Sequence, residues 1–207
     1  MKNLFIIGAG KLGRQIYSFF CQSDLPFKFK GFLDARKDIL SGYNYQEQIV
    51  SSAEEYIPEE NDVFVCAIGD PQIKKEICQR LIDKKAIFIN LIHPTAILGK
   101  NVKLGIGNII CPYCVLSCDI EVGNHVLIDM HSVIAHDVKI KDYVQIACNT
   151  TINGCATINE AARIYSNACV LPNITIEKNA TVGAGSVAIK TVPEGKTIFG
   201  VPGRIIT

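Results

Sequence analysis

Aliphatic residues recur at every sixth position through the second half of the chain. Counted from Ile92 to Val182, all sixteen positions at this spacing are Leu, Ile or Val. The residue four places after each is usually small or β-branched, and Asn108 is the one clearly polar exception. A period of six does not fit an α-helix, and it is too regular for unrelated strands. The pattern therefore predicts a parallel β-helix.

In such a β-helix each hexapeptide forms one flat side, and three sides make a coil of about 18 residues. The aliphatic residue and its small partner point inward and stack on their equivalents roughly 4.8 Å along the axis. We therefore expect an all-β, left-handed parallel β-helix of about five coils, which together with a C-terminal tail occupies residues 91–207.

The first ninety residues follow a different pattern, in which short apolar strands alternate with helices. A strand at residues 4–7 runs into Gly8-Ala9-Gly10-Lys11-Leu12-Gly13, which has the GxGxxG form, and an amphipathic helix follows. A second strand then ends at Asp34. This order of strand, glycine turn, helix, strand and acid is typical of a dinucleotide-binding domain. The glycines let the backbone approach a phosphate, and the helix N-terminus favours an anion.

The predicted N-terminal domain is nevertheless small for a complete dinucleotide-binding fold. Only two further strands are evident, at residues 63–68 and 86–89, with a helix at residues 72–84 between them. One mononucleotide-binding half fits a nucleotide-activated sugar better than NAD. We therefore predict an α/β Rossmann-like half domain at residues 1–90 that binds a nucleotide sugar, followed by the β-helix.

Composition and charge narrow the possible partners and location. The net charge is +1 and charged residues are 20% of the chain, which gives no reason to expect nucleic acid or an anionic membrane as partner. The chain has no apolar stretch of the roughly 18 residues that a membrane span needs, and its first apolar run is too short for a signal peptide. A cytoplasmic protein is expected.

One pair of cysteines has the form of a redox motif. Cys111-Pro112-Tyr113-Cys114 is a CxxC sequence, but no helix pattern follows it and both cysteines are in register with the repeat. A packing role is therefore favoured over redox chemistry. No metal site is predicted.

Seven segments spread over nearly the whole chain match a known family. They are Ile7–Gly10, Phe32–Asp34, Ala67–Asp70, Ile92–Pro94, Ser132–Asp137, Cys169–Asn173 and Gly200–Gly203. With these segments the chain resembles the bacterial sugar O- and N-acyltransferases with hexapeptide repeats. That group includes sialic acid O-acetyltransferases and nucleotide-sugar 4-amino N-acetyltransferases.

This resemblance implies two ligands and a homotrimer. The nucleotide sugar would bind with its phosphates near Gly8, Gly10 and Lys11 and with its base and ribose near Asp34, Gly69 and Asp70. Acetyl-CoA, the acyl donor, would lie along the β-helix between two subunits. The implied acetyl-CoA contacts are Gln145, Gly154, Ser166, Asn167, Ala184 and Arg204.

His136 matches the catalytic histidine of the family, and Asp137 follows it where relatives often have Glu. The reaction itself also requires a base, apart from the resemblance, because a sugar amine must lose a proton as it attacks a thioester. Histidine can accept that proton near neutral pH, and an adjacent carboxylate can orient the ring and stabilise the imidazolium. His136 is therefore predicted to be the general base and Asp137 its partner, whereas His125 and His131 are predicted to be solvated surface residues.

Several positions depart from the family pattern. Leu12 and Gln145 stand where relatives often have histidine, and Asn149 and Tyr165 stand where glycine is common. The leading prediction is an acetyl-CoA-dependent N-acetyltransferase acting on the 4-amino group of a nucleotide-linked 4-amino-4,6-dideoxy sugar. One alternative is an O-acetyltransferase acting on a sialic acid or another sugar hydroxyl. The other is a non-catalytic nucleotide-sugar-binding protein, which Gln145, Asn149 and Tyr165 favour and the intact histidine–acid pair opposes.

Overall fold

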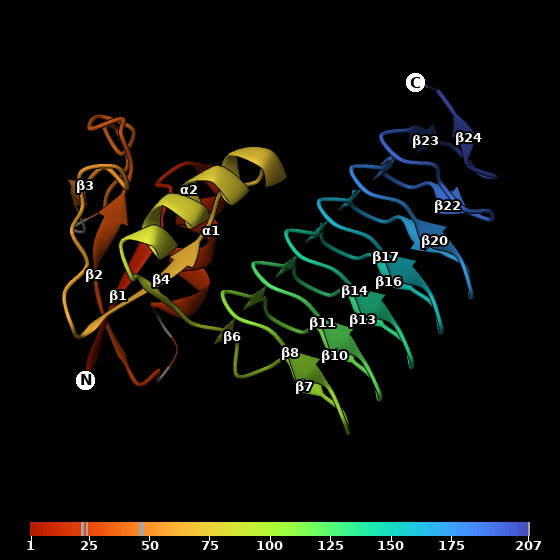
Figure 1. Ribbon diagram of the computed structural model, residues 1–207, viewed down its shortest axis with the longest axis horizontal. Coiled ribbons are helices and arrows are strands. Elements are labelled where there is room, and N and C mark those ends of the chain that lie inside the picture. Colours follow the sequence, from red (N-terminus) through yellow and green to blue (C-terminus); the bar gives the residue numbers. More distant parts are fainter. Residues whose placement is uncertain (22, 24, 46–47, 207) are drawn as a thin grey trace. The chain divides into compact units, whose positions relative to one another are not determined.

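The computed structural model describes residues 1–21, 23, 25–45 and 48–206, which form two compact units divided between Ile89 and Asn90 (Figure 1). The first unit contains both helices of this described part, and the second is built from short strands. Neither helix has the length and apolar character that crossing a membrane would require.

The first unit is a parallel sheet with strand order β3-β2-β1-β4-β5. Helix α1 connects β1 to β2, and α2 connects β4 to β5. The carboxyl ends of β1 and β4 are neighbours at the point where the strand order reverses, which is where open parallel sheets bind ligands. The elements are β1 (Lys2–Ile7), α1 (Lys11–Phe20), β2 (Phe27–Leu33), β3 (Ile49–Ser51), β4 (Asp62–Cys66), α2 (Pro71–Asp83) and β5 (Ile87–Phe88).

The prediction of only two strands after β2 is wrong, because β3 adds a third. This strand is three residues long and pairs with the end of β2 at the sheet edge. Its side chains are exposed or half-buried, so it lacks the continuous apolar run of a buried parallel strand. By contrast, every residue of β4 is buried, and that strand was evident in the sequence.

The second unit is the predicted left-handed β-helix, and its strands form three faces. Face 1 contains β7 (Ile97–Leu98), β10 (Val115–Leu116), β13 (Val133–Ile134), β16 (Thr151–Ile152), β19 (Cys169–Val170) and β22 (Val187–Ala188). Face 2 contains β8 (Lys103–Leu104), β11 (Glu121–Val122), β14 (Lys139–Ile140), β17 (Thr157–Ile158) and β20 (Thr175–Ile176). Face 3 contains β6 (Leu91–Ile92), β9 (Ile109–Ile110), β12 (Leu127–Ile128), β15 (Gln145–Ile146), β18 (Arg163–Ile164), β21 (Thr181–Val182), β23 (Thr197–Phe199) and β24 (Arg204–Ile205).

Strands at the same place in successive coils pair in parallel, and their register confirms the predicted coil length. Ile134 on β13 lies opposite Leu116 on β10 and Ile152 on β16, and all three side chains are buried. Stacking of the sixth-position residues therefore builds the core of the coil. Asn108 is also 0% exposed, but it is satisfied: Nδ2 donates to the carbonyl of Gly123, and Oδ1 accepts from the N–H of Val126.

The two histidines predicted to be solvated differ in the structure. His131 is exposed and stacks on Tyr113. The prediction for His125 is wrong: it is 2% exposed and stacks on Tyr143, its equivalent in the next coil, with 5.2 Å between ring centroids. The predicted packing role of Cys111 and Cys114 is supported, since both thiols are free and fully buried.

Candidate functional site

The glycine turn between β1 and α1 is packed too closely for other residues. Gly8 has a positive φ of 91°, and a Cβ there would lie 3.1 Å from the carbonyl oxygen of Ala67. A Cβ on Gly13 would lie 1.9 Å from the carbonyl oxygen of Gly8. The first and last glycines thus hold α1 against the loop, and Gly10 is the N-cap residue of α1. Backbone N–H groups at such a helix start are suited to a phosphate.

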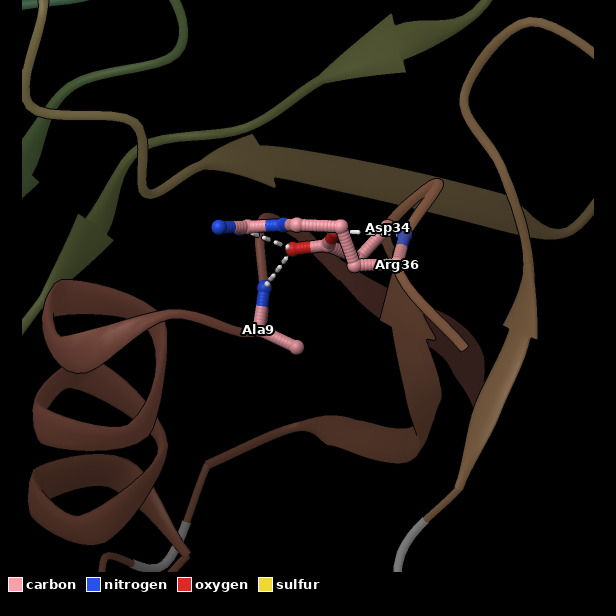
Figure 2. A network of polar contacts seen from close by, with 3 residues as sticks. All are labelled: Ala9, Asp34 and Arg36. Carbon is pink, nitrogen blue, oxygen red and sulfur yellow. Dashed lines mark hydrogen bonds and ion pairs between the residues drawn. The ribbon is translucent and has the colours of Figure 1, made fainter. Parts of the chain in front are cut away.

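Asp34, which follows β2, is hydrogen-bonded to the backbone of this loop. It is 8% exposed, and its Oδ2 accepts from the Ala9 N–H at 2.9 Å and from Arg36 Nη2 at 2.8 Å (Figure 2). Oδ1 accepts from Arg36 Nε at 2.9 Å and from the Arg36 backbone N–H at 3.0 Å. The carboxylate therefore fixes both the glycine loop and a bidentate arginine.

These contacts favour the ionised form of the Asp34 carboxyl. Burial alone would raise its pKa, but the hydrogen bonds from the Arg36 side chain and from Ala9 outweigh burial and lower the pKa below its usual value. The guanidinium is in turn held near the loop, because its Nη2 would lie 3.7 Å from a Cβ on Gly10. The sequence patterns do not predict a role for Arg36. The sequence feature that could have indicated such a role is an arginine two places after the acid that follows a strand.

The other predicted nucleotide contacts lie on the ends of β1 and β4. Lys11 is exposed in the first turn of α1, and Gly69 precedes α2. Asp70 is the N-cap residue of α2, where its Oδ1 accepts from the N–H groups of Gln72 and Ile73. A cap of this kind is a structural role for one carboxylate oxygen.

A cavity of about 730 Å³ opens beside Asp34 at the ends of β2 and β3. This volume is within the range of small-molecule sites. Its lining includes Asp34 but none of the other predicted nucleotide contacts. The lining residues are Asp34, Ala35, Lys37, Leu40, Tyr45, Gln48, Ile49, Val50, Ser51, Ser52, Glu54 and Glu55.

In the β-helix, His136 and Asp137 form a pair on the turn that follows β13. Nδ1 of His136 lies 2.8 Å from Oδ2 of Asp137, and each side chain is 58% exposed. An ionised carboxylate can only accept, so Nδ1 donates and the lone pair of Nε2 stays available as the basic site. A hydrogen bond this exposed contributes little stability. The turn thus carries an exposed imidazole that is oriented by a carboxylate.

Gly154 lies beneath this ring, one coil further along. A Cβ on Gly154 would lie 2.6 Å from Cε1 and 2.7 Å from Nε2 of His136. The absence of a side chain at Gly154 is therefore what allows the imidazole its position. We call the turns at residues 135–138 and 153–156, which follow face 1, the histidine corner.

Three of the predicted acetyl-CoA contacts lie on a different corner of the coil. Ser166, Asn167 and Ala184 belong to the turns at residues 165–168 and 183–186, which follow face 3 and which we call the serine corner. Ser166 lies 3.3 Å from the thiol of Cys148, and Asn167 and Ala184 are exposed. Within one chain, the structure does not bring these residues to His136.

The last two predicted contacts lie on face 3 itself. Gln145 on β15 is half-buried and lies between Leu127 and Arg163 in register. Arg204 on β24 is exposed and pairs with Phe199 on the antiparallel strand β23. Of the predicted acetyl-CoA contacts, Gly154 is thus the one that lies at the histidine corner.

The second unit is a hexapeptide-repeat β-helix, and the exposed histidine–acid pair lies on one of its turns. The family model for the PglD N-terminal domain matches residues 3–81, and the model for bacterial transferase hexapeptide repeats matches residues 119–154. The chain thus combines a segment similar to the PglD N-terminal domain with a segment similar to bacterial transferase hexapeptide repeats.

Individual proteins are similar to this chain in sequence or in fold. The chain is 33% identical over 114 residues to UDP-N-acetylbacillosamine N-acetyltransferase of Bacillus subtilis; the match covers 52% of this chain and spans about half of that relative (50%). Perosamine N-acetyltransferase of Caulobacter crescentus, solved as a histidine variant with CoA and GDP-perosamine, has the same fold: the TM-score is 0.88 at 21% identity, over 100% of this chain and 98% of that one. The acetyltransferase domain of PglB from Neisseria gonorrhoeae, solved with acetyl coenzyme A, gives 0.87 at 22% identity over 99% of each chain.

Proposed function

We propose that the protein transfers an acetyl group from acetyl-CoA to the 4-amino group of a nucleotide-linked 4-amino-4,6-dideoxy sugar. The observation that carries this proposal is the exposed His136–Asp137 pair seated on Gly154, in a chain that also has a nucleotide-type half domain. Its relatives include an enzyme named for N-acetyl transfer to a UDP-linked amino sugar, and a solved structure with the same fold holds CoA and GDP-perosamine.

In this mechanism the neutral sugar amine attacks the thioester carbonyl of acetyl-CoA. A C–N bond forms, and Nε2 of His136 takes the proton that the nitrogen releases. Asp137 accepts from Nδ1 and stabilises the imidazolium that results. The C–S bond then breaks, and the imidazolium returns the proton to the leaving CoA thiolate. The products are the amide and free CoA.

The nucleotide would be held at the switch point of the first unit. The N–H groups at the start of α1, together with Gly8, Gly10 and Lys11, would contact the phosphates. Asp34 would act there mainly by fixing the loop and Arg36, because its oxygens already accept from Ala9 and Arg36. Arg36 thereby becomes a further candidate contact for the phosphates or the base.

The acetyl-CoA site would be completed by a second copy of the chain, as in a homotrimer. The histidine corner and the serine corner are separated by one six-residue side of the coil, up to about 20 Å of extended chain. A neighbouring subunit could bring its serine corner to His136. Face 1 also presents an exposed apolar row to a partner, with Ile97 on β7 and Val133 on β13.

The test is thiol release from acetyl-CoA in the presence of UDP-, dTDP- and GDP-linked 4-amino sugars, with sialic acid as the hydroxyl acceptor. Turnover on an amino sugar that is lost in His136→Ala supports the proposal. The matched control is His131→Ala, which removes an exposed imidazole that packs on Tyr113 instead of a carboxylate. Turnover on sialic acid alone would replace N-acetylation with O-acetylation. Nucleotide-sugar binding without any thiol release would indicate the non-catalytic alternative.

A further inference from the structure

Beside the His136–Asp137 pair lies a thiol that acetyl transfer does not use. Cys155 is exposed and occupies the place in its coil that Asp137 occupies in the coil before. The φ angles of the two residues are 59° and 61°, so both side chains leave the turn from the same backbone conformation. One donor atom from each of His136, Asp137 and Cys155 lies within 4.8 Å of the other two.

These three donors match the preference of one kind of metal ion. Imidazole nitrogen, thiolate sulfur and carboxylate oxygen are the ligands of Zn²⁺, at about 2.0–2.3 Å from the ion. In a tetrahedral site, donor atoms at those distances lie about 3.5 Å apart. The donor atoms of the three residues lie at most 4.8 Å apart, so they need to approach one another by only about 1 Å to bind the ion. Because all three side chains are exposed, rotation about their χ angles can close it without moving the backbone.

The surrounding charges also favour a cation. A groove of about 400 Å³ at this corner is lined by Asp119, Glu121, Asp137, Lys139, Cys155 and Thr157. Three carboxylates and one amine therefore line it, and Glu121 also lies 3.9 Å from Lys103 Nζ. Asp119 occupies the same place as Asp137 one coil earlier. Its Oδ1 accepts a hydrogen bond from Asn101 Nδ2 at 2.8 Å.

We propose that His136, Asp137 and Cys155 bind one Zn²⁺ ion, with a solvent molecule as the fourth ligand. Binding of Zn²⁺ would convert the histidine corner from a general base into a metal site. Coordination through Nε2 uses its lone pair directly, and coordination through Nδ1 leaves the ring proton on Nε2. Either way the imidazole can no longer accept a proton, so Zn²⁺ would inhibit acetyl transfer; this consequence, but not the binding itself, rests on the proposed function.

Binding can be measured on the purified full-length chain without any turnover. Zn²⁺ affinity is obtained by competition with a chromophoric chelator, and Co²⁺ in place of Zn²⁺ reports a thiolate ligand by its charge-transfer absorption. We expect one ion per chain and at least about tenfold weaker binding in Cys155→Ser and in His136→Ala. The cobalt–thiolate band should vanish in Cys155→Ser. The matched control is Cys21→Ser, which removes an exposed thiol of the first unit and should leave both measurements unchanged.

Zn²⁺ affinity that is the same in Cys155→Ser as in the unsubstituted chain would overturn the site, and so would the absence of binding at micromolar Zn²⁺. The inhibition is tested separately. If acetyl transfer occurs, the Zn²⁺ concentration that halves it should equal the dissociation constant measured by competition. Transfer that persists at saturating Zn²⁺ would refute the inhibition, whereas binding in the absence of any transfer would support the metal site and count against the proposed function alone.

Discussion

Replacing Gly154 with alanine should disable the proposed base without unfolding the chain. The added Cβ would lie 2.6 Å from Cε1 and 2.7 Å from Nε2 of His136, whereas carbon atoms pack at roughly 3.5–4.0 Å. The imidazole must therefore retreat by about 1 Å. It is exposed and can move, so the clash is relieved by the ring and not by the coil backbone.

The size of the effect follows from this displacement. A misplacement of about 1 Å in a catalytic group can reduce the rate by roughly 100-fold, which corresponds to about 2.7 kcal/mol of transition-state stabilisation. Stability should change little, because Gly154 does not have a positive φ and alanine costs no backbone strain there. Alanine can even stabilise the chain by up to about 1 kcal/mol through the unfolded state.

The assay is a double-mutant cycle of thiol release, in which Gly154→Ala, His136→Ala and the double variant are compared with the unsubstituted chain. If Gly154 acts only by seating the imidazole, the double variant will be no slower than His136→Ala alone. The reasoning is refuted if Gly154→Ala keeps full activity. It is also refuted if the loss is the same size in the His136→Ala background, since glycine would then serve another part of the site.

The β-helix could be predicted from sequence because its signal is repeated. Each inward position recurs at every sixth residue and stacks on its equivalent in the next coil, so one rule specifies all three faces. The first unit carries no such redundancy. Strand β3 is short and poorly buried, and it joins the sheet through backbone pairing with β2 instead of through apolar side chains. No local pattern of hydrophobic residues marks a strand of that kind.

The site was predictable where it depends on one local motif and not where it depends on contacts between coils. His136 and Asp137 are adjacent in sequence, and their pairing needs only a turn. The burial of His125 depends on Tyr143 in the next coil, and the neighbourhood of Cys155 depends on Asp137 in the previous one. Both follow from the coil repeat, because side chains at equal positions in successive coils are neighbours, whereas the hydrophobic pattern indicates only which residues point inward.

Three further substitutions test the framework that supports the two sites. Asn108→Ala should destabilise the β-helix by about 3 kcal/mol in chemical denaturation, because the buried N–H of Val126 and the half-buried carbonyl of Gly123 lose their hydrogen bonds; an unchanged midpoint would contradict that. Asp70→Ala should cost about 1 kcal/mol by uncapping α2, whereas Asp70→Asn should restore most of it. The last substitution, Asp34→Asn, tests a dependence on pH. The pKa of Asp34 is lowered in the folded chain despite its burial, because Arg36 and the Ala9 N–H donate to the carboxylate. The folded state therefore binds this proton less readily than the unfolded chain, whose aspartate pKa is about 3.9. The contribution of the carboxylate is fully present above that value and is lost as the pH falls through the lower folded pKa. Unfolding free energies measured from pH 6 to pH 3 should decline more steeply at the acid end for the unsubstituted chain than for Asp34→Asn, and parallel curves would show that the carboxylate does not stabilise the loop through its charge.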